Sequence, residues 1–514
     1  MRCSASRRIA VLAITVATAA VCAAPAAASH SHAPKPGDVG IGDTLFPTLG
    51  NGGYDAQHYS MALRYPTADP GTTVHGRITM FARATQALSR FNLDFAGDSV
   101  VSVSVDGRRA DFDWDDEELS ITPRHALRDG EKFAATVRYT AHAFTPAQGD
   151  IFPFGFFTVN GGSVTAGQPN VGHTFYPVND HPADKASYDI SFNVPEGTTA
   201  VANGDLVFRR SHAGRSYSAY VMREPMASEL IQLTVGAFDV TTQPKTRGVK
   251  IRDVTSSSIT AAALGRLQRT PMHLNWMIDR VGKYPFNTYG VLGADQLFGY
   301  ALETQTLSLH PAFVLFQTYP LQFGDPLMVH ELAHQWFGDS VAPVRWQDVW
   351  LNEGHADYYE KTYAAEFFNF DLIGYWRGEY QVANQYRAQY RPVAKPTGTD
   401  IFTLFSDNVY GGGSLVLYAL RQVVGESTFS EIERSWVKKY KDESVSTEDF
   451  IAHVNKVSHR NLTSFLRHWL YDDTVPPMPG HPDWTADPAT AAAARTAAAA
   501  APSARTLELG IYKR

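Results

Sequence analysis

The sequence predicts a multidomain α+β protein in which an all-β half is followed by a mainly helical half. The chain has 514 residues, enough for two or three domains, and 44% of them are hydrophobic against 19% charged, as in folded globular proteins. Apolar residues recur at every second position from about residue 54 to residue 240, and after residue 250 the period lengthens towards 3.6. We therefore place a β domain at residues 46–246 and a helical domain at residues 247–478.

Alternating segments that end in tight turns define the β half. The segment 101–105 reads Val-Ser-Val-Ser-Val, and the Asp106-Gly107 that follows is typical of a hairpin turn. The segment 188–194 alternates in the same way, and Asn203-Gly204 marks another turn. These segments predict an all-β module.

Helical periodicity marks four segments of the second half, at residues 261–281, 326–338, 353–368 and 413–424. Asp325-Pro326 resembles an N-cap followed by proline at the first helical position, so we expect the second of these helices to begin there. The three glycines 411–413 are expected to form a loop that leads into the fourth helix.

The two ends of the chain are not expected to belong to either domain. Residues 1–28 have an arginine-containing start, an apolar run over 9–24 and a small-residue end, which is the layout of a cleaved secretory signal peptide. A membrane anchor is the alternative, but the run is shorter than the roughly 20 residues of a span, so no stable membrane insertion is expected. The only cysteines, Cys3 and Cys22, would leave with this segment. The Pro- and Ala-rich residues 479–514 predict a disordered tail.

The charge balance argues against a nucleic-acid partner. Lys and Arg number 45 against 52 Asp and Glu, which gives a formal net charge of −7, and no basic block interrupts the chain. The oligomeric state is not predicted by any pattern in the sequence.

The chemistry is indicated by the pentapeptide His330-Glu331-Leu332-Ala333-His334. Two histidines four positions apart on a helix project from one face, about one turn apart, which suits two bonds to one zinc ion. Glu331, between them, can then act as a general base on a water at the metal.

A third protein ligand would complete a catalytic zinc site, which keeps one position open for water. Glu353 lies nineteen positions after His334, in a second predicted helix, and can approach the two histidines from there. Asp357, one turn later, is placed to accept a hydrogen bond from a ligand ring. His355 points to another face of this helix and is expected to line the pocket or to pack, not to be a fourth ligand. The alternative is a solvated helical face with scattered His and Glu.

Residues 330–339 (HELAHQWFGD) and 350–354 (WLNEG) resemble the zinc aminopeptidases of the aminopeptidase N and leukotriene hydrolase family. The resemblance extends over about residues 54–477. It implies a saddle-like β domain followed by a thermolysin-like catalytic domain, and one zinc ion per chain. Because the sequence stops soon after the catalytic domain, the large C-terminal helical domain of many relatives is expected to be missing. It further implies that His330, His334 and Glu353 are the ligands, that Glu331 is the general base, and that the substrates are peptides with a free N-terminus.

Three further positions match the family. Residues 300–304 (YALET) stand where the family has G-A-M-E-N, so Glu303 is implied to bind the substrate's α-amino group. Tyr410 stands at the tyrosine of Y-x-K-G and is implied to donate to the transition state, and Gln168 matches a β-domain residue beside the amine. Thr304, Tyr300 and Gly412 depart from the family's residues, which affects the preferred N-terminal residue more than the chemistry.

We therefore interpret the sequence as that of a secreted, zinc-dependent aminopeptidase. Two alternatives remain open, a thermolysin-like zinc endopeptidase and a non-catalytic binding module with a structural metal site. The site has two histidines, a carboxylate as the third ligand and a candidate base. This set argues against the second alternative, because closed structural sites usually have four protein ligands.

Overall fold

The computed structural model describes residues 33–67, 73–115, 117–296, 298–398 and 401–487. The described residues from Pro34 to Asp487 belong to one compact unit. The predicted signal peptide and residues 488–514 of the predicted tail lie outside the described residues. In the described part of the chain, no helix combines the length and the apolar character that crossing a membrane requires.

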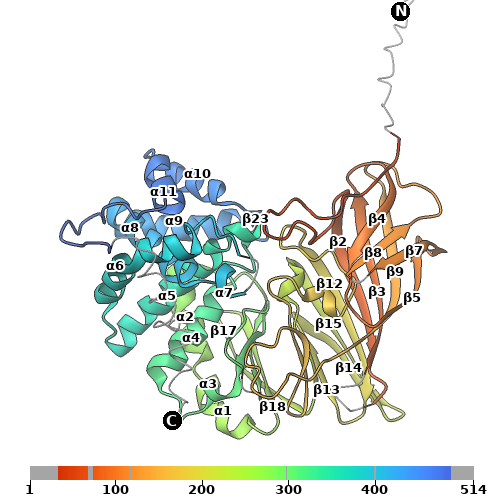
Figure 1. Cartoon of the computed structure of the whole chain (residues 1–514). Helices are drawn as coiled ribbons and strands as arrows, with labels where there is room; N and C mark the ends of the chain where they lie inside the picture. Colours follow the sequence, from red (N-terminus) through yellow and green to blue (C-terminus); the bar gives the residue numbers. More distant parts are fainter. Residues whose placement is uncertain (1–32, 68–72, 116, 297, 399–400, 488–514) are drawn as a thin grey trace, which may run out of the picture. The chain divides into compact units, whose positions relative to one another are not determined.

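The first half of the chain is a β domain, as predicted (Figure 1). Its largest sheet has eight strands in the order β14-β15-β12-β2-β3-β9-β5-β6. Buried and less buried residues alternate along β2, β3, β9 and β12, because one face of the sheet packs on the core. The strands are β2 (Tyr54–Arg64), β3 (Thr73–Ala84), β5 (Ser99–Val105), β6 (Arg108–Arg109), β9 (Lys132–His142), β12 (Ala186–Pro195), β14 (Asp205–His212) and β15 (Arg215–Met226).

Two four-stranded sheets complete this domain. One has the order β1-β4-β8-β7 and the other has the order β10-β11-β16-β13. Strands of the second sheet are followed in the chain by residues of the site described below. The strands are β1 (Lys35–Pro36), β4 (Leu88–Asp94), β7 (Asp111–Asp115), β8 (Glu118–Thr122), β10 (Gly155–Val159), β11 (Gly162–Ala166), β13 (Thr199–Ala202) and β16 (Leu233–Gly236), with short 3-10 helices η1 (Gly172–Thr174) and η2 (Ser228–Leu230).

The second half is mainly helical but begins with a further sheet. That sheet has the order β17-β18-β20-β21, with β19 paired to β18. Its strands are β17 (Phe238–Thr246), β18 (Val249–Ser256), β19 (Thr288–Tyr289), β20 (Val291–Ala294) and β21 (Ser308–Pro311), and β22 (Ala342–Pro343) pairs with β23 (Ser444–Val445). The helices are α1 (Thr260–Leu267), α2 (Thr270–Val281), α3 (Ala312–Leu315), α4 (Leu321–Ala333), η3 (Trp346–Asp348), α5 (Trp350–Phe368), α6 (Leu372–Tyr390), α7 (Ile401–Leu404), α8 (Asp407–Val424), α9 (Glu426–Lys439), α10 (Thr447–Ser458) and α11 (Thr463–Tyr471).

Helix α4 begins at Leu321, five residues before the predicted start. Asp325 is not its N-cap but a fully buried carboxylate inside the helix, 3.0 Å from Arg266 Nη1 and 2.5 Å from Arg269 Nε. Pro326 is the sixth residue of α4, beyond the first four whose N–H groups have no acceptor within the helix, so it lies inside the helix and not at its start. The acid-proline pair therefore marks an internal ion-pair site rather than the helix boundary.

The expectation of a loop at the three glycines is also wrong, because α8 runs through them. A Cβ atom built on Gly354 of α5 would lie 2.9 Å from the Cα of Gly413, closer than real Cβ contacts allow. Glycine at both positions therefore lets α5 and α8 cross at backbone contact. Packing between helices, not a chain reversal, explains these glycines.

Helices α4 and α5 form the centre of the helical domain. Every residue of α4 from 324 to 333 is buried, as are residues 350–361 of α5. A helix that is buried on all sides lies inside a domain rather than on its surface. Residues that project from these two helices towards each other are thus shielded from bulk water.

The predicted tail starts later than residue 479. Trp484 is only 7% exposed, and its ring stacks at 4.1 Å on His481 and at 6.1 Å on Tyr418 of α8. Residues 481–487 therefore pack on the helical domain.

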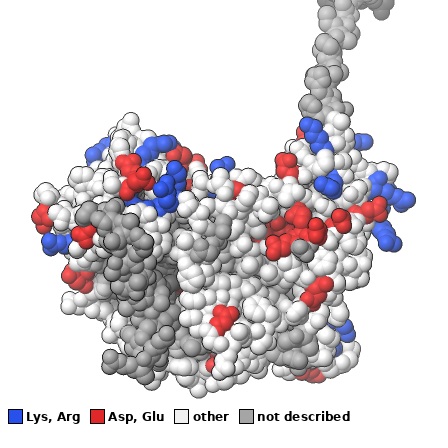
Figure 2. Space-filling view, viewed as in Figure 1, with Lys and Arg blue, Asp and Glu red and all other residues white. Residues whose placement is uncertain are grey.

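On the face that Figure 2 shows, acidic and basic side chains form small separate groups.

Candidate metal centre

Helices α4 and α5 bring the three predicted metal ligands together. His330 lies in the last turn of α4, His334 caps its C-terminal end, and Glu353 lies in the first turn of α5. Glu353 Oε2 lies 3.4 Å from His330 Nε2 and 3.3 Å from His334 Nε2. The three side chains are at most 2% exposed, so their donor atoms meet in a water-poor interior.

This donor set fits zinc. Histidine nitrogen and carboxylate oxygen bind zinc at about 2.0–2.2 Å in a tetrahedral arrangement, which separates neighbouring ligand atoms by about 3.3–3.5 Å. The two measured separations from Glu353 have this length. Among the described residues, neither His330 Nε2 nor Glu353 Oε2 has a hydrogen-bond partner, as expected of atoms reserved for a metal.

The other nitrogen of each ring is held by the protein. His330 Nδ1 lies 2.9 Å from Glu360 Oε2, and His334 Nδ1 lies 3.1 Å from the carbonyl oxygen of Phe337. Both partners accept, so each Nδ1 carries the proton and each Nε2 presents its lone pair to the site.

The structure gives to Glu360 the contact that we predicted for Asp357. Asp357 instead accepts a hydrogen bond at 2.9 Å from the hydroxyl of Tyr375 on α6 and lies 3.8 Å from Lys361 Nζ. Glu360 lies two turns after Glu353 on α5 and reaches the ring of His330. His330 itself lies one helical turn before His334. The shorter Asp357 side chain is engaged by its own neighbours.

Glu353 is held as an anion. Burial by itself raises the pKa of this carboxyl group, but the adjacent imidazoles of His334 and His330 outweigh burial and hold the pKa well below its usual range. An ionised carboxylate is the form that ligates a metal.

Glu331 and Tyr410 lie beside this centre. Glu331 is fully buried, and a carboxylate oxygen of Glu331 lies within 4.8 Å of ligand atoms of both His334 and Glu303. The ring of Tyr410, on α8, stacks over the ring of His330 with 5.8 Å between centroids and 22° between planes. The structure thus brings the candidate base and the candidate donor to the same metal centre.

The β domain contributes one side of the site. Gln168 Nε2 donates to Glu303 Oε1 at 2.7 Å, and Glu303 and Gln168 are 2% and 7% exposed. Gln335 Nε2 of the helical domain holds the backbone carbonyl of Glu303 at 3.1 Å. The two residues implied to bind the substrate amine are therefore in direct contact, although they are far apart in the sequence.

The expectation that His355 packs is confirmed. Its ring stacks on Phe337 at 4.3 Å, and its Nδ1 lies 2.7 Å from the carbonyl oxygen of Leu351. Tyr300, where the family has glycine, stacks at 4.5 Å on Phe154 of the β domain and donates its hydroxyl hydrogen to a backbone carbonyl there. This departure therefore adds contact between the domains.

Two functional candidates were missed by the sequence analysis. Glu360 stands seven positions after Glu353, and this two-turn helical spacing on α5 was an available signal for it. Glu229, a buried acid of the β domain discussed below, has no local pattern that marks it.

Comparison with known proteins matches each half of the chain to a known family domain. The peptidase M1 N-terminal domain matches residues 55–230, and the peptidase family M1 domain matches residues 271–469. Leukotriene A-4 hydrolase of Xenopus laevis is 25% identical over 60% of this chain and 52% of its own length, and a probable aminopeptidase 2 of Sulfurisphaera tokodaii is 24% identical over 59% and 40%. The chain thus spans about half the length, or less, of these relatives.

Solved structures agree with this comparison. An M1 zinc metallopeptidase from Deinococcus radiodurans has a TM-score of 0.75 and 29% identity, covering 86% of this chain and 99% of that one. A mutant of the Deinococcus enzyme was solved with a Tyr-Ser-Ala substrate. With both family domains matched in order and the zinc-binding donor set assembled, the chain belongs to peptidase family M1, a family of zinc metallopeptidases.

Proposed function

We propose that this protein is a secreted zinc aminopeptidase that removes N-terminal residues from peptides. One observation carries the proposal: the carboxylate of Glu303, held by Gln168, lies buried beside the metal centre and close to Glu331. An ammonium group bound there would place the first peptide bond of a substrate at the metal. A buried anion beside the metal centre suits an exopeptidase, which must hold a free N-terminus, and has no use in an endopeptidase.

The bound zinc would polarise the scissile carbonyl and lower the pKa of a water molecule. Glu331 takes the proton of the attacking water and returns it to the nitrogen of the leaving amine. The hydroxyl of Tyr410 donates a hydrogen bond to the oxyanion that develops on the carbonyl oxygen. Glu303 and Gln168 hold the α-ammonium group and so set the reacting bond at one fixed distance from the base.

The substrate class has support from the related Deinococcus structure, whose Tyr-Ser-Ala ligand is a short peptide. Export rests on the leader-like residues 1–28 alone. N-terminal sequencing of the protein recovered from the culture medium tests it: a chain starting at Ser29 is expected, and a chain that stays in the cell with an intact leader contradicts secretion.

The deciding experiment compares aminoacyl-aminomethylcoumarins and short peptides with and without N-acetylation. We expect hydrolysis of the free-amine forms only, stepwise loss of N-terminal residues in mass spectrometry, loss of activity on chelation and recovery with zinc. Internal cleavage of N-acetylated peptides would instead identify an endopeptidase. A zinc-loaded protein that turns over neither form would favour the structural-site alternative.

A further inference from the structure

Glu229 lies between the two chain segments that supply the amine-binding residues. It belongs to η2, whose Leu230 carbonyl accepts a hydrogen bond at 3.1 Å from the backbone N–H of Gln305, two residues after Glu303. On the other side, a Cβ atom at Gly167, the residue before Gln168, would lie 2.9 Å from the Glu229 carbonyl oxygen. The backbone of η2, through Glu229 on one side and Leu230 on the other, therefore touches both segments.

The carboxyl group of Glu229 is buried but not satisfied. The residue is 3% exposed, close to the 2% of Glu303, and its Oε2 has no hydrogen-bond partner among the described residues. Among the described residues, Glu229 forms no ion pair; the nearby Lys185 Nζ donates instead to the backbone carbonyls of Asp339 and Ser340 at 2.7 and 2.9 Å. A buried carboxyl oxygen without a partner is costly, and such a group is typical of a binding site.

The surroundings of Glu229 favour a cation. Burial, with the neighbouring charges of Asp180 and Glu303, raises the pKa of Glu229 to about 8, while Lys185 acts in the opposite direction. An added positive charge between Glu229 and Glu303 would relieve their repulsion.

The number of hydrogen-bond donors on the substrate's ammonium group also favours a further acceptor. A substrate α-ammonium group has three N–H donors, and Glu303 already uses one carboxylate oxygen to accept from Gln168. We propose that Glu229 is a third amine-binding residue, which accepts a hydrogen bond from the α-ammonium group alongside Glu303 and Gln168. This inference rests on the proposed aminopeptidase function and adds a residue to its substrate site.

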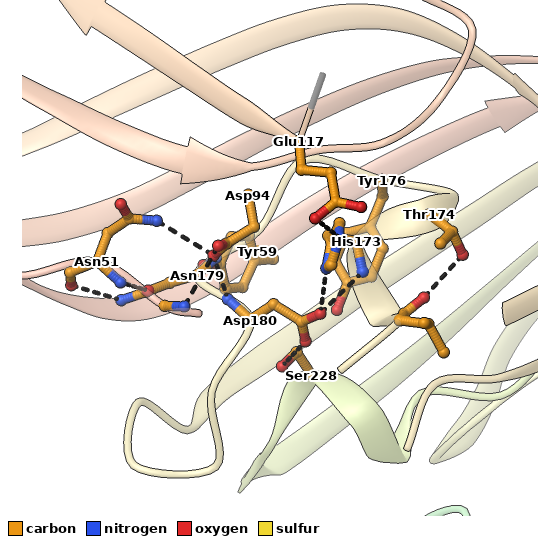
Figure 3. Close-up of polar contacts among 12 residues, drawn as sticks. Asn51, Tyr59, Asp94, Glu117, His173, Thr174, Tyr176, Asn179, Asp180 and Ser228 are labelled. Carbon is orange, nitrogen blue, oxygen red and sulfur yellow. Dashed lines mark hydrogen bonds and ion pairs between the residues drawn. The ribbon is translucent and has the colours of Figure 1, made fainter. Parts of the chain in front are cut away.

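A polar network in the β domain holds η2 in place for this role (Figure 3). Ser228 Oγ, next to Glu229, donates to Asp180 Oδ1 at 2.6 Å, and the other oxygen of Asp180 lies 2.6 Å from His173 Nδ1. The backbone N–H of Asp180 donates in turn to Asp94 Oδ2 at 2.8 Å. The position of Glu229 is therefore fixed before substrate arrives, which lowers the cost of ordering on binding.

Binding of an amino-acid amide and of its des-amino analogue, measured by calorimetry on the zinc-loaded enzyme, tests the proposal. Glu229→Gln and Glu229→Ala should each weaken binding of the amide about 10-fold or more, the usual effect of losing a hydrogen bond to a charged group. Binding of the des-amino analogue should not change. With free-amine substrates the same variants should raise KM more than they lower kcat.

The pH dependence supplies a second readout. The amide's α-amino group itself titrates at about pH 8 and affects wild type and variant alike, so the readout is their difference. The advantage of the wild type over Glu229→Gln in amide binding should grow from pH 6 to pH 8 as Glu229 ionises. The titratable groups that face Glu229, namely Asp180, Glu303, Lys185 and Asp339, remain in the variant. Glu118→Gln is the matched control, because Glu118 also has a buried oxygen without a partner but lies on β8, beside Asp94, His173 and Arg90.

Unchanged amide binding in a folded Glu229→Gln protein would overturn the inference. Equal weakening of amide and des-amino binding would do the same, since it would show a structural role. If Glu229→Ala does not fold, the same binding measurements on Glu229→Gln and Glu229→Asp still test the inference. A wild type that binds zinc but neither binds amides nor hydrolyses free-amine substrates would refute the aminopeptidase function itself, which is a distinct outcome.

Discussion

Glu360 Oε2 accepts a hydrogen bond at 2.9 Å from His330 Nδ1 and thereby fixes which nitrogen of that ring faces the metal centre. Burial raises the pKa of Glu360, but Lys361 and His330 outweigh burial and lower it to about 2. The group that orients the ring is thus an anion throughout the physiological range.

Replacement of this group should weaken the metal site. We expect Glu360→Gln to lower zinc affinity about 10–100-fold, because the partners of ligand histidines typically have effects of this size. Competition with a fluorescent chelator measures it. Asp357→Asn is the control on the same helix, since Asp357 accepts from Tyr375 rather than from a ligand ring, and it should retain nearly the wild-type affinity. A larger loss of zinc affinity in Asp357→Asn than in Glu360→Gln would contradict the assignment.

Tyr410→Phe should separate transition-state stabilisation from binding. The phenyl ring can keep the stacking on His330, but the hydroxyl donor is lost, so kcat should fall about 10²–10³-fold with little change in KM or zinc content. Steady-state kinetics with metal analysis checks this. Tyr418→Phe, two turns later on α8, serves as the control and should keep its kcat. A wild-type kcat in Tyr410→Phe would remove the tyrosine from the mechanism.

Asp325 anchors the helix that carries the two histidines. Removing its charge with Asp325→Ala leaves the fully buried Arg266 without a counter-ion, which typically destabilises a protein by about 3–5 kcal/mol. Denaturant unfolding measures the loss. Glu448→Gln breaks the exposed pair with Arg467, where both side chains are more than half exposed, and should change the free energy of unfolding by less than about 1 kcal/mol. Similar effects of the two variants would contradict the buried-anchor role.

Folding stability should fall as the pH rises through 9. Burial lowers the pKa of His173, but Asp180 and Asp94 outweigh burial and raise it to about 9. The folded protein therefore holds a proton that the unfolded chain loses near pH 6.5, so this contribution is complete below that pH and disappears above about 9. Asp94, with a pKa raised by burial and by Asp180 to about 7, acts in the same direction at lower pH.

Urea unfolding between pH 6 and pH 10 checks this prediction. His173→Gln should flatten the decrease between pH 6.5 and 9, whereas His142→Gln, at an exposed site of the same domain, should keep the wild-type slope. A wild-type slope in His173→Gln would mean that other groups dominate the pH dependence.

Helix geometry explains why the metal site could be predicted from the sequence. The spacing of His330 and His334 forces both rings to one face of α4, and Glu353 follows in a short, characteristic segment. The alternation of the β strands and the register of their turns were equally local signals, as at Asp106-Gly107. Local patterns of this kind place residues on a face without reference to the rest of the fold.

Tertiary contacts explain what the sequence could not predict. Gly413 signals a loop by composition, but its role is to let α8 touch α5 at Gly354. Asp325 before a proline has the pattern of a cap, but it is buried inside α4 and pairs with Arg266 of α1 and with Arg269 just before α2. Which acid reaches His330 depends on how separate segments meet in space. The contact of the η2 backbone with the segments that carry Gln168 and Glu303 depends on this as well.

The most direct test of the account is an anomalous difference map at the zinc edge from crystals of the zinc-loaded protein. We predict one peak per chain, at about 2.0–2.2 Å from His330 Nε2, His334 Nε2 and a Glu353 carboxylate oxygen. A map with no peak among these three side chains, or with its peak elsewhere, would contradict the account.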